Sequence, residues 1–189
     1  MLKQRVVDAY VFAQKAHAGQ TRRFTGEPYF KHPKGVARSI EHLTRDEDMI
    51  IAALLHDVVE DCQVPLSEIR NRFGAQVADY VDALTSDKDE LAAAESKAKY
   101  LIDKMLKMSE EELVLKLADR VDNIRYADKD CKTLKHKQFV RKYYDETREI
   151  FDAIYFRGYS ENTKNEALIF LMSAVHLELE YLRIKYLWT

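Results

Sequence analysis

Apolar side chains recur every three or four positions along most of this 189-residue chain, which is the spacing of amphipathic helices. A first helix is predicted over residues 2–18, ending before Gly19. A second helix is predicted to begin around Pro33, a residue suited to a first helical turn, and to run to about Leu43. Residues 19–32 between them form a predicted loop.

The middle of the chain continues this pattern. A helix is predicted from near Glu47 through Asp61, followed by a short helix starting at Ser67 and by another ending near Thr85. Residues 86–107 are highly charged and rich in Ala and Lys, and we expect a solvated helix or mobile loop there that carries no chemistry.

The last part of the chain predicts three more helices. Ser109 and Glu112 have the spacing of a capping box, which opens a helix over residues 113–125. Residues 132–189 read as two long helices separated near Gly158, with Ser160 as the N-cap of the second. The side chains expected to be mostly core in these last helices are Phe151, Ile154, Tyr155, Leu168, Ile169, Leu171, Met172, Val175, Leu179 and Leu182.

Composition supports an all-α fold. The chain has only five glycines and three prolines beside 47% hydrophobic and 33% charged residues, which leaves little turn chemistry for a sheet of many strands. The length suits one domain with a sizeable core. We therefore predict a single-domain helical bundle over residues 1–189, with its motifs in residues 13–125 and residues 132–189 closing the bundle.

Charge and cysteine content exclude several classes of protein. The formal charge of −2 and the pI near 6.3 provide no basic field for binding duplex nucleic acid. Cys62 and Cys131 make neither a disulfide framework nor a zinc-ligand spacing. No apolar run approaches the ~20 residues of a membrane span, and no secretion signal is recognised at the start. A cytoplasmic protein is expected; the oligomeric state does not follow from these features.

Residues 52–61 combine an apolar run with four ionisable side chains. If this stretch is helical, His56, Asp57, Glu60 and Asp61 share one side of it, opposite the apolar side chains. Burial of unpartnered carboxylates is costly, so three acids and an imidazole beside a core-facing stripe indicate a bound cation, most simply a divalent metal. The alternative is an ordinary amphipathic helix whose polar side meets water.

Other side chains could complete such a site. His32 can supply a metal ligand from a helix start, and Asp119 lies one helical turn before Asn123 in a mostly apolar helix. Arg22 and Arg23 can grip phosphate oxygens, because a guanidinium presents a planar fork to them. For His32 the alternative is a structural role, and for the arginines it is a solvated surface loop.

Tyr143 and Tyr144 lie on the first of the two long C-terminal helices. Either ring could stack on a nucleobase, although packing within the core is the commoner fate of such a pair.

Four motifs in order resemble a known family. They are residues 26–33 (GEPYFKHP), 52–61 (AALLHDVVED), 73–77 (FGAQV) and 116–120 (KLADR). Over residues 13–125 they resemble the hydrolase domain of RelA/SpoT homologues, and most closely the small alarmone hydrolases of the HD-domain superfamily. No synthetase-like region is recognised after these motifs.

This resemblance implies a metal-dependent site, usually for manganese. The implied site residues are His32, His56, Asp57 and Asp119 as metal ligands, Glu60 and Asp61 as the pair that activates water, and Arg22, Arg23, Asn123 and Tyr143 as substrate contacts. The sequence departs from the family pattern at Cys62, Asp122 and Tyr126. The last two bear on nucleotide preference, whereas the metal and catalytic positions match.

The resemblance implies hydrolysis of a small-molecule nucleotide, with removal of the 3′-pyrophosphate of guanosine tetra- or pentaphosphate to give pyrophosphate and GDP or GTP. One alternative keeps the site but changes the substrate to another 3′- or 5′-phosphorylated nucleotide. The other is a regulator that binds the alarmone without cleaving it.

Overall fold

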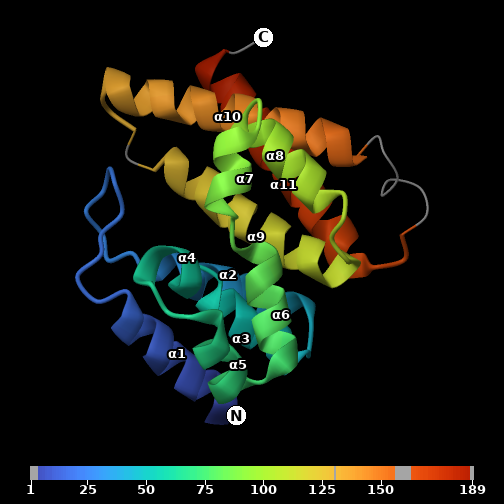
Figure 1. The fold of residues 1–189 in the computed structure, drawn as a ribbon. Coiled ribbons are helices and arrows are strands. Elements are labelled where there is room, and N and C mark those ends of the chain that lie inside the picture. The colour runs from blue at the N-terminus through green and yellow to red at the C-terminus, as the bar shows by residue number, and fades with distance from the viewer. Residues whose placement is uncertain (1–3, 130, 156–162, 188–189) are drawn as a thin grey trace. The chain divides into compact units, whose positions relative to one another are not determined.

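The computed structural model describes residues 4–129, 131–155 and 163–187, and those residues are helical apart from their connections and one isolated bridge between Thr21 and Pro28 (Figure 1). This confirms the predicted all-α class. The chain divides into two compact units, Met1–Ser86 and Asp87–Thr189. The expectation that the whole chain is one domain therefore stays a prediction.

The first unit is built around an apolar helix. Its helices are α1 (Gln4–Ala16), α2 (Lys31–Leu43), α3 (Glu47–Leu55), α4 (Val58–Cys62), α5 (Leu66–Phe73) and α6 (Ala75–Leu84). Helix α3 packs against α1, α2 and α6, and six of its nine residues are buried, as expected of a helix that is apolar on every side. The Asp46 carboxylate caps its start by accepting from two backbone N–H groups.

The second unit contains α7 (Lys88–Ala93), α8 (Lys97–Met105), α9 (Glu110–Ala127), α10 (Leu134–Ile154) and α11 (Glu166–Tyr186). Helix α9 packs against α10 and α11, and α8 packs against α10. The predicted capping box is present, since Ser109 and Glu112 each bond the other's backbone N–H. No helix in the described ranges is long and apolar enough to cross a membrane.

Three expectations about the second half need correction. Residues 97–105 are not a solvated segment: α8 buries Tyr100, Leu101 and Met105, because its apolar side packs on α10. Tyr155 and Ile169, expected in the core, are exposed. Ser160 lies outside the described residues, and the N-cap that α11 shows is Asn165.

Candidate metal centre

The helix that carries His56 and Asp57 ends at these two residues instead of continuing through them. The predicted unbroken helix is therefore wrong: α3 stops at Leu55, and α4 begins at Val58. The His56 ring nitrogen Nδ1 lies 2.9 Å from the carbonyl oxygen of Ala53, which in an unbroken helix would accept from the N–H of Asp57. Asp57 leaves helical geometry, with φ −99° and ψ −5°. Both side chains therefore come from the short connection between α3 and α4.

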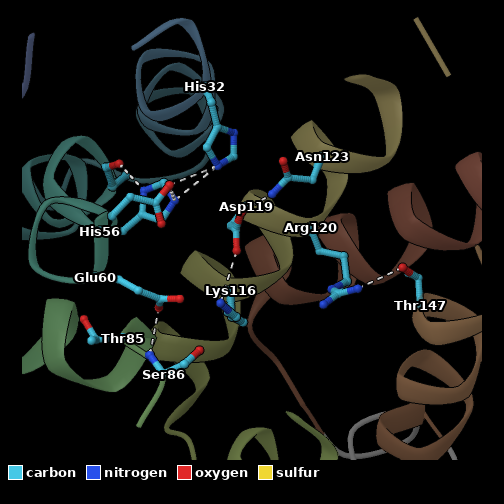
Figure 2. A network of polar contacts seen from close by, with 12 residues as sticks. His32, His56, Glu60, Thr85, Ser86, Lys116, Asp119, Arg120, Asn123 and Thr147 are labelled. Atoms are coloured by element: carbon cyan, nitrogen blue, oxygen red, sulfur yellow. Dashed lines mark hydrogen bonds and ion pairs between the residues drawn. The ribbon is translucent and has the colours of Figure 1, made fainter. Parts of the chain in front are cut away.

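The same bond orients the His56 ring. A carbonyl oxygen can only accept, so Nδ1 is the donor of this pair and Nε2 is the ring nitrogen that faces His32. His32, in the first turn of α2, points its Nε2 at that atom across 3.2 Å, and Figure 2 shows the two rings converging. Both histidines are 2% exposed. Two buried imidazole nitrogens that face each other at this distance are arranged to share a proton or a cation.

Asp57 brings a carboxylate to the same point. Its Oδ2 lies 3.1 Å from Nε2 of His56 and 3.6 Å from Nε2 of His32. The Tyr29 hydroxyl donates to the same oxygen at 2.7 Å. The carboxylate is thus held in place by a neutral donor while it faces the two rings.

These three ligand atoms fit a divalent metal. Bonds of about 2.1 Å, usual for nitrogen and oxygen ligands, place neighbouring ligand atoms about 3.0–3.5 Å apart in octahedral or tetrahedral geometry. The separations of 3.1 and 3.2 Å fall within this range, and the third, 3.6 Å, lies just above it. Imidazole and carboxylate together suit first-row metals such as manganese, iron or zinc.

Glu60 and Asp61 lie on α4, directly after the break. Glu60 is half-buried, and its Oε2 accepts from the backbone N–H of Ser86 at 2.9 Å (Figure 2). The contact lies at the first residue of the segment 86–107, for which we expected no chemistry. The pKa of Asp61 is raised above its ordinary value, first by partial burial of the carboxyl and then by the negative charges of Asp57 and Glu60. A raised pKa suits a carboxylate that takes up a proton.

The loop that carries Arg22 and Arg23, between α1 and α2, is folded back on itself and is not a freely solvated segment. The backbone N–H of Arg22 donates to the carbonyl of Glu27 at 2.8 Å, and the N–H of Tyr29 donates to the carbonyl of Gln20 at 2.9 Å. As a result Arg22 is only 7% exposed, with its guanidinium 5.9 Å from the centre of the Tyr29 ring. Arg23 is exposed and lies over its neighbour Phe24. The two arginines therefore differ in environment.

In the second unit, Asp119 is held on α9 by its own helix. Asn123, one turn later, donates to its Oδ1 at 2.6 Å, and the Lys116 ammonium lies 3.2 Å from its Oδ2 (Figure 2). Asp119 and Lys116 are both buried. Asp119 and Asn123 share one face of α9, as their spacing of one turn requires. The contribution of Lys116 was missed, although its spacing of three residues permits it.

Tyr143 lies in a contact between α9 and α10. The buried guanidinium of Arg120 sits 5.1 Å from the centre of its ring, donates to Thr147 at 2.9 Å, and pairs with Glu146 at 3.2 Å. Tyr144 is buried, as packing within the core requires, while Tyr143 keeps partial exposure. Sequence reasoning missed Arg120, because nothing local to it signals the partners on α10.

A polar cluster next to Asp57 was also missed. Buried His17 lies with its ring 5.0 Å from that of Tyr29, and its Nδ1 is 2.7 Å from Oε1 of Gln20 and 3.2 Å from Sγ of Cys62. Gln20 also donates to the carbonyl of Asp61 at 3.1 Å. Tyr29 belonged to a recognised motif, but only the fold shows that its hydroxyl meets a carboxylate.

Comparison with known proteins identifies the family of this chain. The family model described as the HD domain matches residues 9–155. A protein of Aquifex aeolicus named guanosine-3′,5′-bis(diphosphate) 3′-pyrophosphohydrolase is 40% identical over 120 residues, which are 62% of this chain and 17% of that protein. A protein of the same name from Haemophilus influenzae is 33% identical over 170 residues, which are 88% of this chain and 24% of that protein.

The chain thus spans about a fifth of the length of these curated relatives. One similar solved structure is described as that of a metazoan ortholog of SpoT that hydrolyses ppGpp. The match has a TM-score of 0.77 and 24% identity, and it covers 100% of this chain and 99% of that one. At this identity the likeness concerns the fold.

Proposed function

Because this chain belongs to the HD-domain family, we propose that it is a metal-dependent pyrophosphohydrolase that removes the 3′-pyrophosphate of guanosine tetra- or pentaphosphate, releasing pyrophosphate and GDP or GTP. The relatives named for this reaction support the choice of substrate. The cytoplasmic location expected from the sequence stays a prediction.

The observation that carries the proposal is the convergence of His32, His56 and Asp57. A pair of buried imidazoles facing each other at 3.2 Å beside a carboxylate is a ligand set suited to a cation. The Ala53 carbonyl fixes the His56 ring so that its Nε2 faces His32 and Asp57, which is the usual way a protein orients a metal-binding histidine. We propose that these residues hold a divalent metal, manganese by the family resemblance, and that Asp119 of the second unit is a fourth ligand.

When bound, such a metal makes hydroxide available near neutral pH and polarises a phosphoryl oxygen. We assign Glu60 and Asp61 to the water. Glu60, oriented by the N–H of Ser86, positions the attacking water, and Asp61 accepts its proton, for which the raised pKa is suited.

Arg22 and Arg23 are proposed to neutralise the phosphates. Arg22 is the better positioned of the two, because the folded loop and the Tyr29 ring restrict its side chain and reduce the entropy lost on binding. We propose Asn123 and Tyr143 as contacts for the nucleoside. Asn123 would combine this role with holding Asp119.

Two other functions make different predictions. An HD phosphohydrolase for another 3′- or 5′-phosphorylated nucleotide would use the same metal and water-activating residues. A non-catalytic alarmone-binding regulator would have no use for Glu60 and Asp61 beside the ligands, so the presence of both carboxylates on α4 favours an enzyme.

The test is a product analysis with purified protein, manganese and a panel of 3′- and 5′-phosphorylated nucleotides. We expect pyrophosphate and GDP from guanosine tetraphosphate, no turnover after chelation of the metal, and recovery when manganese is restored. Glu60→Gln is the matched control, since it keeps size and hydrogen bonding while removing the charge. Preferential cleavage of another nucleotide would refute the substrate, and binding without turnover of any nucleotide would refute the enzyme.

A further inference from the structure

One face of the last long helix carries large apolar side chains in a symmetrical spacing. Helix α11 buries seven residues against its own unit, where it packs on α9 and α10. On its opposite face Phe170 is 58% exposed, Leu177 67%, Tyr181 51% and Ile184 64%. With exposed Ser173 these residues form a stripe, because at about 100° per residue all five lie within roughly 40° of Leu177 around the helix.

The spacing along this stripe is the same in both directions. Phe170 and Ile184 lie seven residues from Leu177, and Ser173 and Tyr181 lie four residues from it. A twofold axis through Leu177 that reverses the helix direction therefore superposes the stripe on itself. In such a pair Phe170 meets Ile184 of the second copy, small Ser173 meets large Tyr181, and Leu177 meets its equivalent.

The two sides of the stripe also match. Phe170 and Tyr181 lie on one side of the line through Leu177, and Ser173 and Ile184 lie on the other, so each layer of an antiparallel pair combines one residue from each side, as knobs-into-holes packing requires. An isologous contact of this kind is the commonest form of self-association. Antiparallel helices also set their dipoles in the favourable orientation.

We propose that the exposed stripe of α11 is the interface of a homodimer, with two α11 helices packed antiparallel about Leu177. Two of the charges beside the stripe are paired within the unit: Glu180 pairs with Arg183, and Lys185 pairs with Asp128 at the C-cap of α9. Exposed Glu166 lies one turn before Phe170, where the stripe ends. The stripe spans a helix of about 31 Å, so the interface is small and we expect a dimer that depends on protein concentration.

Sedimentation of the full chain at about 1 to 200 µM tests the proposal. We expect a concentration-dependent monomer–dimer equilibrium in the parent, and at least a tenfold weaker dimer for Leu177→Glu, because two like charges would meet on the axis. Val11→Glu is the matched control: Val11 is 56% exposed on α1 of the first unit, so the dimer of this variant should match the parent. A parent that is monomeric throughout overturns the proposal, as does equal weakening by both variants.

Two further measurements test the register without relying on loss of association. An equimolar mixture of Leu177→Glu and Leu177→Lys should recover the dimer as a heterodimer, since the opposite charges meet on the axis. Leu177→Cys should cross-link to its own equivalent on oxidation. The amount of cross-linked dimer formed by Ser173→Cys should not exceed that of the parent, in which Cys62 and Cys131 set the background level of cross-linking. A mixture that stays monomeric, or self-cross-linking through Ser173→Cys, overturns the antiparallel register.

Discussion

The hydroxyl of Tyr29 should control how tightly the metal is held. It donates to Oδ2 of Asp57 at 2.7 Å, the oxygen that also faces both histidine rings. Tyr29→Phe removes this donor and leaves the ring, which keeps its contacts with His17 and His32. Groups that hydrogen-bond to a metal ligand typically raise the affinity for the metal 10- to 100-fold, or by about 1.4–2.8 kcal/mol. We expect manganese affinity to fall by that factor.

In the assay, metal-free protein is titrated with manganese, and the affinity is measured by calorimetry or by competition with a chelator of known affinity. Turnover at saturating manganese should stay within a few-fold of the parent, because the ligands and the water-activating carboxylates remain. Tyr10→Phe is the matched control: Tyr10 lies in the same unit, and its ring packs edge-on against Phe30 at 4.9 Å. Unchanged affinity in Tyr29→Phe, or lost activity that excess manganese does not restore, would refute this reasoning.

Asp57→Ala should abolish metal binding and turnover together, since a hard cation loses an anionic ligand; a full metal content by elemental analysis would contradict the ligand assignment. Glu60→Gln should keep the metal and lower kcat by on the order of 10²-fold or more in steady-state assays, and loss of its metal would instead make Glu60 a ligand. Arg22→Ala should raise KM more than Arg23→Ala and weaken the salt dependence of KM, because Arg22 is buried against the Tyr29 ring whereas Arg23 is exposed. A KM equal to that of the parent at two ionic strengths would mean that other groups bind the phosphates. Arg120→Ala should destabilise the fold by about 3–5 kcal/mol in urea unfolding, since it leaves Glu146 buried without its cation, and a change below about 1 kcal/mol would contradict that pairing.

Local chemistry made much of the fold predictable from the sequence. The capping box at Ser109 acts within a few residues of the helix start that it defines, so its presence in the structure agrees with the prediction. His32, His56 and Asp57 could be selected because ionisable groups in apolar runs require partners, whatever the fold.

Tertiary contacts decided the features that the sequence could not show. The His56 ring faces His32 of α2, 24 residues away in the chain, a contact that helical periodicity does not contain. Arg22 is buried because the loop folds back onto Tyr29, and Tyr100 is buried because α8 packs on α10. Periodicity records which side of a helix is apolar, whereas burial and hydrogen bonding depend on which distant residues meet that side, and only the folded chain brings those residues together.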